Sequence, residues 1–194
     1  MAIDFSPSGN VGSQVERAVI AHLKWFLQQA GLPAIEFRFG NDGRDRPDEL
    51  IEVVSMKSTE SPTHTRNEIC EVRIELVWPG RDDPNTQSGN WNWIKINQYI
   101  GTIMAAMSVS DNAGNDYAAT CALLNKWGSA LAVDASGGLN PTQVAIAKDN
   151  ADMANFTAQY LRYRGAARAG VSGGAIVYRE IRNFEIDACS ANVD

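Results

Sequence analysis

Residues 70–78 alternate between apolar and mostly polar side chains, and this pattern constrains the fold more than any other feature of the chain. One face of an extended strand would carry Cys70, Val72, Ile74, Leu76 and Trp78, and the other Glu71, Arg73, Glu75 and Val77. Successive side chains of a strand point to opposite faces, so the pattern predicts a sheet strand with one apolar and one polar face. The polar face is either solvated or opposed by the charges of a partner.

A helix is predicted over residues 14–30 by apolar residues that recur at spacings of three and four. These residues are Val15, Val19, Leu23, Phe26, Leu27 and Ala30. Ser13 and Glu16 have the spacing of a capping box at the helix start. Gly31, followed by Pro33, is predicted to end the helix because glycine adopts the left-handed conformation of the residue after a helix.

Further strands are expected at residues 34–39, 50–56, 156–164 and 175–189, the last either as one long strand or as two joined by a bulge near Arg182 and Asn183. Further helices are expected at residues 91–107, 117–131 and 140–152. Residues 57–67 and 165–174 are predicted as loops, because they are polar or rich in small residues. This order predicts an α+β domain, in which the N-terminal helix and a middle helix pack on a largely antiparallel sheet.

Composition excludes several classes of protein. The chain has 194 residues, of which 44% are hydrophobic, which argues against disorder. Its net charge of −6 argues against a protein that reads a DNA groove, since such a protein needs a basic surface. No apolar run has the length of a membrane span, and the first residues lack the features of a signal peptide, so we expect a cytosolic chain. The three cysteines are expected to be buried thiols without a disulfide.

Candidate catalytic and metal-binding residues are few. Ser172 lies in a GxSxG sequence, but a strand rather than a helix is predicted after it, and both histidines precede it. His22 and His64 have no further ligand at metal-binding spacing. Residues 42–49 are acidic but do not follow the ligand spacing of an EF-hand, and no phosphate-binding glycine loop occurs. We therefore expect no enzyme activity, no metal and no cofactor.

Three tryptophans, Trp78, Trp91 and Trp93, lie close together around a connector rich in proline and glycine. They are either core residues or anchors for a neighbouring subunit, because tryptophan is enriched at interface hot spots. We take Trp91 and Trp93 as candidate interface residues, together with Arg168 in the predicted loop at residues 165–174.

Three stretches of the sequence resemble the tail-terminator, or tail-completion, proteins of tailed bacteriophages and the related head–tail connector proteins. They are the opening helix SQVERAVIAHLKWFLQQAGLP, the strand–loop–strand segment LIEVVSMKSTESPTHTRNEICEVRIELVW and the closing strand VYREIRNFEIDA. The helix INQYIGTIMAAM also has a counterpart in that family. The stretches cover about half of the chain, and residues 108–155 are interpreted as a helical insertion within a single domain spanning residues 1–194.

The resemblance implies a virion structural protein, made in the cytoplasm of the bacterial host, at the junction between phage tail and neck. It implies a ring, expected to be a hexamer, that ends growth of the tail tube and joins the tail to the neck. Its partners would be other copies of itself, the tail tube protein, a neck, stopper or connector protein and, in some tails, a sheath protein. Double-stranded DNA would pass through the lumen without sequence recognition, and no membrane would be involved.

Six copies would carry a formal charge of −36, six times −6. A negatively charged lumen would repel the DNA that passes through it and prevent it from binding. Glu71 and Glu75 are the candidate residues that line this lumen. Two alternatives remain at this stage. One is another ring protein of the same assembly, such as a stopper, a neck component or a tube subunit. The other is an α+β module that binds a small ligand or a peptide.

Overall fold

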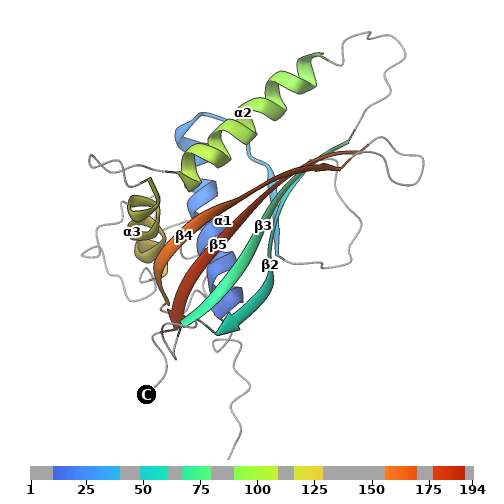
Figure 1. Cartoon of the computed structure of the whole chain (residues 1–194). Helices are drawn as coiled ribbons and strands as arrows, with labels where there is room; N and C mark the ends of the chain where they lie inside the picture. Colours follow the sequence, from blue (N-terminus) through green and yellow to red (C-terminus); the bar gives the residue numbers. More distant parts are fainter. Residues whose placement is uncertain are drawn as a thin grey trace, which may run out of the picture.

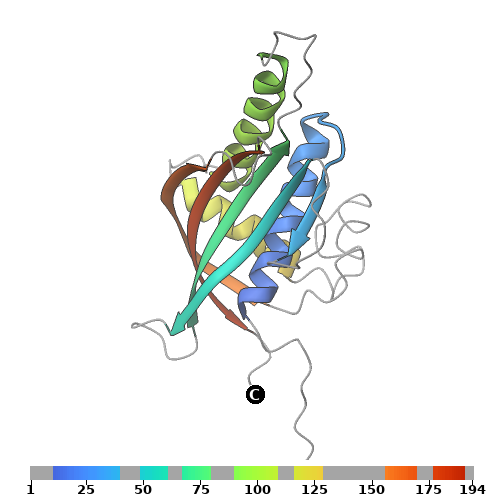
Figure 2. The ribbon, with the colours of Figure 1, turned by 90° about the vertical axis from the view of Figure 1, so that its right-hand side faces the viewer.

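The computed structural model describes residues 11–39, 49–60, 67–79, 90–108, 116–128, 156–169 and 177–190. In these ranges, three helices lie on one side of a five-stranded sheet, as Figures 1 and 2 show from two directions. The predicted α+β class with a largely antiparallel sheet is confirmed.

The sheet has the strand order β1-β2-β3-β5-β4. The bounds are β1 Glu36–Phe39, β2 Leu50–Glu60, β3 Asn67–Pro79, β4 Phe156–Ala169 and β5 Val177–Ser190. Only β1 and β2 run parallel, and every other neighbouring pair is antiparallel. The closing strand of the sequence, β5, therefore lies inside the sheet, whereas β4, which precedes it, forms an edge.

Burial confirms the apolar face predicted for residues 70–78, whereas on the other face Glu71 is exposed but Glu75 and Val77 are buried as well. The five side chains of the apolar face, Cys70, Val72, Ile74, Leu76 and Trp78, are all buried. They join Ile51 and Val53 of β2 and Phe184 and Ile186 of β5 in one hydrophobic core beneath the helices. Figure 2 shows the opposite face, which no helix covers in the part of the chain that the structure describes. We call it the open face.

The first helix, α1 (Val11–Gln29), lies against the middle of the sheet, and Val15, Val19 and Leu23 on it are fully buried. Gly31 has a positive φ of 66°. Its N–H donates to the carbonyl of Gln28, and the Leu32 N–H donates to that of Leu27. These two hydrogen bonds form a Schellman motif, so the predicted role of Gly31 is confirmed.

The predicted capping box is wrong. The helix begins at Val11, so Ser13 lies inside its first turn rather than before it. The carboxylate of Glu16 accepts a hydrogen bond from the backbone N–H of Ser55 in β2. A local pattern cannot distinguish these two uses of a glutamate, because the competing donor is 39 residues away.

The second helix, α2 (Asn90–Met107), buries Ile96, Tyr99, Ile103 and Met107, which recur at spacings of three and four. The third, α3 (Asp116–Gly128), lies in the segment interpreted as an insertion and packs against β4 and α1. The helix predicted at residues 140–152 lies outside the described residues.

Both predicted loops are partly wrong. Lys57–Glu60 continue β2, and Asn67 already belongs to β3. Gly165–Ala169 continue β4. Each segment looks polar or small in sequence, yet its backbone is paired with that of a neighbouring strand. Residues 61–66 and 170–176 lie outside the described residues.

Residues 177–190 form one long strand, which was one of the two alternatives for this segment. The pairing of β5 with β3 runs without interruption through Arg182 and Asn183. The irregularity lies instead on the partner strand, where the register of β4 shifts between Tyr163 and Gly165, opposite Phe184 and Asn183. An extra residue in one strand is therefore accommodated by a bulge in β4.

Candidate assembly surfaces

The sheet ends in two edges of very different length. On one side, β1 pairs only with the first four residues of β2, from Leu50 to Val53. Beyond Val53, no described strand pairs with the outer side of β2. On the other side, β4 is a 14-residue strand that pairs with β5 alone. Unpaired N–H and C=O groups along such edges can pair with a strand of another chain.

A side chain from α3 closes one position of the β4 edge. Asn125 Nδ2 donates a hydrogen bond to the carbonyl of Ala158 at 3.0 Å, and its Oδ1 accepts the Ala158 N–H at 2.6 Å. The amide thus occupies both backbone groups that a further strand would bind at Ala158. Antiparallel pairing alternates between inward and outward backbone groups. Following the register onward from Ala158, the next outward groups of β4 belong to Leu161, Tyr163, Ala166 and Arg168.

A side chain from α1 closes one position of the β2 edge in the same way. Ser55 lies two residues beyond the part of β2 that β1 covers, and its N–H donates to Glu16 Oε1 at 2.5 Å. Burial raises the pKa of Glu16 above its ordinary value, although the Ser55 hydrogen bond and the charge of Arg17 oppose this shift. Two helices therefore each supply one polar side chain to one edge of the sheet.

The charges of the sheet are separated between its two halves. Strands β1, β2 and β3 carry six acidic and three basic residues, a formal charge of −3. Strands β5 and β4 carry five basic and three acidic residues, a formal charge of +2. The edge strand β4 contributes three arginines and no acid. The two edges therefore belong to halves of opposite charge in a chain that is acidic as a whole.

The two candidate lumen residues lie on the open face but in different environments. Glu71 is exposed and makes no ion pair with any side chain that the structure describes. Glu75 is only 2% exposed. Its Oε1 lies 3.0 Å from Arg179 Nη1, and its Oε2 lies 3.6 Å from Arg73 Nε. The carboxylate of Glu75 is thus neutralised inside its own subunit, whereas that of Glu71 faces solvent.

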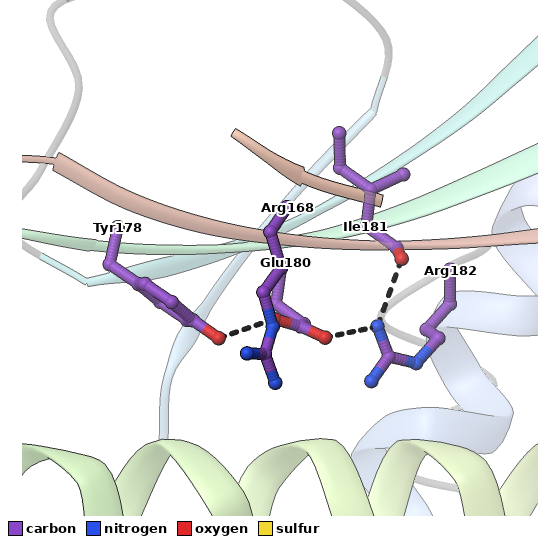
Figure 3. Close-up of polar contacts among 5 residues, drawn as sticks. All are labelled: Arg168, Tyr178, Glu180, Ile181 and Arg182. Carbon is purple, nitrogen blue, oxygen red and sulfur yellow. Dashed lines mark hydrogen bonds and ion pairs between the residues drawn. The ribbon is translucent and has the colours of Figure 1, made fainter. Parts of the chain in front are cut away.

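Arg168, the candidate interface residue, is 70% exposed in its side chain and lies on β4 rather than in a loop. It pairs with Glu180 of β5 at 2.9 Å, and Arg182 pairs with the same carboxylate at 2.5 Å. Figure 3 shows these side chains together with that of Tyr178, on the side of the sheet where α2 runs. We call these four residues the Glu180 cluster.

The Glu180 cluster carries one more positive than negative charge. Burial acts to raise the pKa of Glu180, but the hydrogen bonds from Tyr178 and Arg182 and the charges of Arg182 and Arg168 hold it below its ordinary value. Burial and the neighbouring carboxylate raise the pKa of Tyr178 to about 12. The carboxylate of Glu180 therefore stays ionised near neutral pH.

Two shallow hollows lie outside these clusters. One, of about 260 Å³, lies on the open face between Met56, Glu71 and Arg164. The other, of about 200 Å³, lies between the end of α1 and β1 and is lined mainly by apolar side chains that include Leu27, Leu32 and Phe37. The polar side chains that line the first hollow are Glu71, Arg164 and Asn183, and Arg164 is already paired with Glu185 of β5.

Trp78 is a core residue whose ring packs against that of Tyr99. Trp91 and Trp93 fall within the first turn of α2, but their side chains lie outside the described residues. Cys70 and Cys121 are buried free thiols, as predicted, and Cys189 is a partly buried one.

His22 is also buried, with Nε2 2.8 Å from the carbonyl of Ala106 and Nδ1 3.3 Å from the indole nitrogen of Trp127. His64 and Ser172 lie outside the described ranges. Among the described residues, no three histidine, cysteine, aspartate or glutamate side chains are grouped so as to hold a metal ion. None of the described helices combines the length and the apolar character needed to cross a membrane.

The chain matches no protein-family model, and a search of well-characterised proteins found none with a similar sequence.

The sequence pattern suggested Glu71, Glu75 and Arg168 as candidates, but it did not indicate the residues that close the sheet edges. Asn125 occurs in a run of alanine and leucine and gives no local signal of its role. Glu16 was assigned to its own helix. The separation of charge between the sheet halves could have been found by summing charge strand by strand, but only once the order β3-β5-β4 was known.

Proposed function

We propose that this chain is a virion structural protein that forms a ring at the head-proximal end of a phage tail tube. The ring ends growth of the tube and joins the tail to the neck, and it works by contact rather than by catalysis. Its partners are further copies of itself, the tube protein and a neck or stopper protein, and DNA passes through its lumen. The resemblance of three sequence stretches to tail terminators suggests this function.

The observation that carries the proposal is a sheet whose two unlike edges belong to halves of opposite charge. The half that ends in β4 has a formal charge of +2, and the half that ends in β1 and β2 has −3. Two copies are therefore attracted when the β4 edge of one faces the β2 edge of the other. Such a head-to-tail contact repeats from copy to copy and gives a closed ring when its rotation closes.

The arrangement of the strands is compatible with the resemblance. The strand–loop–strand segment of the sequence contains β2 and β3, which pair antiparallel along most of their length. The closing stretch contains most of β5, which lies inside the sheet between β3 and β4. The opening helix is α1, which packs on the middle strands.

Of the two candidate lumen residues, Glu71 is the better one. Its carboxylate is exposed on the open face, whereas that of Glu75 is buried beside two arginines. In this proposal Glu71 contributes to the negative potential of the lumen through which DNA passes, and Glu75 stabilises the sheet through its ion pairs with Arg73 and Arg179.

The proposal is tested by mass and by binding to tail tubes. Native mass spectrometry and negative-stain images of the purified chain should show rings. When the rings are added to tubes of the same phage lacking their own terminator, they should bind one tube end and stop further elongation. A chain that stays monomeric with and without tubes would contradict the proposal.

The second candidate, another ring of the same head–tail assembly, shares the charge-separated sheet and differs only in its partner. Rings that bind the portal or neck complex but not the tube end would favour a stopper or neck protein. Rings that stack on themselves into tubes would favour a tube subunit.

A further inference from the structure

The geometry points to one specific pairing between copies: β4 of one copy adds as an antiparallel strand to the outer edge of β2 in the next. This inference rests on the ring proposed above and specifies its contact. On β4 the segment is Leu161 to Arg168, which follows the Ala158 position that Asn125 binds. On β2 it is Lys57 to Glu60, which follows the Ser55 position that Glu16 binds. We call these two side-chain contacts the Asn125 cap and the Glu16 cap.

Strand direction favours this pairing. Strands β2, β3, β5 and β4 are neighbours in that order and each runs antiparallel to the next, so β4 runs opposite to β2. When a second copy is placed beside the first by a rotation about an axis along the strands, its β2 therefore lies antiparallel to the first copy's β4. The ladder can continue across the contact with antiparallel geometry.

Both segments offer backbone groups in the right direction. The Ser55 N–H points away from β3, since it reaches Glu16. Following the register past the shift between Ser55 and Lys57, the next outward groups of β2 belong to Ser58 and Glu60. On β4, the outward groups of Ala166 and Arg168 lie in a stretch whose side chains are exposed.

Charge favours β2 of the second copy, rather than its β4, as the partner of β4 in the first copy. Two β4 strands paired about a two-fold axis would bring three arginines against three arginines, with no acid on either strand. The outer edge of β2 lies instead in the acidic half, next to Glu68 and Glu71 of β3. Opposite charges favour the β4–β2 contact, and like charges disfavour the two-fold one.

The two caps set the limits of the contact. Asn125 already binds both backbone groups of Ala158, and Glu16 already binds the N–H of Ser55, so these groups are not available to an added strand. The pairing is thereby restricted to one stretch on each edge, which restricts the possible registers between copies.

The test uses two variants of the full chain, each with one proline substitution at one edge of the sheet. Ala166→Pro removes an outward N–H of β4, and Ser58→Pro removes an outward N–H of β2, while the inward ladders keep their donors. Each variant alone should lose the ring and run as a monomer in native mass spectrometry. An equal mixture of the two should form a heterodimer, because each variant retains the edge that the other lacks. Ala166→Val and Ser58→Val, which keep the N–H, should still form rings.

The outcomes separate this inference from the proposed function. If both proline variants form rings like the parent, the strand pairing is wrong while the ring stands. A two-fold β4–β4 pairing would give a different result. In that case Ser58→Pro would still self-associate, Ala166→Pro would not, and the mixture would form no heterodimer. If the parent chain is monomeric at every concentration, both proposals fail.

A second pair of variants covers the case in which a proline prevents folding, as judged by circular dichroism. Arg162→Glu on β4 and Glu71→Lys on β3 change exposed side chains and leave every backbone N–H in place. Each should raise the dissociation constant for self-association about 10-fold or more at low salt, and their mixture should restore it. Equal weakening in the mixture and in the single variants would overturn the β4–β2 contact.

Discussion

His22 lies where the three helices meet and connects them through both ring nitrogens. Its Nε2 is 2.8 Å from the carbonyl of Ala106 in α2, and its Nδ1 is 3.3 Å from the Trp127 indole nitrogen in α3. The Trp127 N–H can only donate, so Nδ1 accepts and Nε2 carries the proton. Burial lowers the pKa of His22 to about 4, against the opposing effect of the Ala106 carbonyl. The neutral ring satisfies every partner, and a protonated ring would turn a donor toward Trp127.

This histidine should make stability depend on pH. The unfolded chain binds a proton at His22 below about pH 6.5, whereas the folded chain does so only near 4. The stabilisation is therefore complete above 6.5 and falls as pH decreases toward 4, by about 3 kcal/mol in all. Denaturant unfolding between pH 4 and 7.5 measures the slope.

The control is His22→Gln, which cannot titrate. Its unfolding free energy should change less between pH 7 and pH 4.5 than that of the parent. Glu16, whose pKa is raised, contributes with the opposite sign to both proteins, so the difference between them isolates His22. Parallel pH profiles would show that burial does not suppress protonation of this ring.

Glu75 and Glu71 offer a matched comparison on one strand and one face. Glu75→Gln should lower the free energy of unfolding by about 1–3 kcal/mol, because it leaves Arg73 and Arg179 beside a neutral amide. The partial exposure of both arginines keeps the loss below that for a fully buried pair. Glu71→Gln, at an exposed position, should change stability by less than about 0.5 kcal/mol. Equal losses at the two positions would argue against the neutralising role of the arginines.

At the scale of elements, α1 and α3 do more than cover the sheet, because each closes one backbone position of an edge. The edge strand β4 also has two register shifts, which interrupt its regular ladder. Caps and bulges are both means by which proteins limit uncontrolled pairing at sheet edges. The open stretch of β4 is therefore bounded rather than continuous.

Asn125 should contribute measurably to the packing of α3 on β4. Asn125→Ala removes two hydrogen bonds and should cost about 1–2 kcal/mol. Asn125→Asp keeps the acceptor for the Ala158 N–H but turns a second oxygen toward the Ala158 carbonyl, so at pH 7 it should cost at least as much. Ala122→Ser, at an exposed position of the same helix, is the control for changes to α3 itself. Hydrogen exchange at Ala158 should accelerate only in the Asn125 variants, and unchanged exchange would show that the cap is dispensable.

At the scale of the whole molecule, charge separation across the sheet should make self-association depend on salt. Attraction between halves of −3 and +2 is screened over about 8–10 Å at physiological ionic strength. We expect the dissociation constant measured by sedimentation to rise about 10-fold or more between 0.05 and 0.5 M NaCl. A dissociation constant that falls or stays constant would indicate that apolar burial, and not charge, drives association.

The sequence alone determined the local structure where a strong signal lies within a few residues. Alternation at residues 70–78 predicted the buried apolar face of β3, and Gly31 predicted the end of α1, since each depends on the geometry of one strand or one turn. It also determined the fold class, through the order of these elements.

Only the tertiary structure decided the order of the strands and, with it, which residues meet. The partner of Glu16 is 39 residues away, that of Asn125 is 33 and that of Glu75 on β5 is 104. No periodic pattern records such distances, because the pairing of β5 with β3 results from packing the whole sheet against the helices. The pairing of β5 with β3 places opposite charges in opposite halves of the sheet, and this separation is the physical basis of the assembly proposed for this protein.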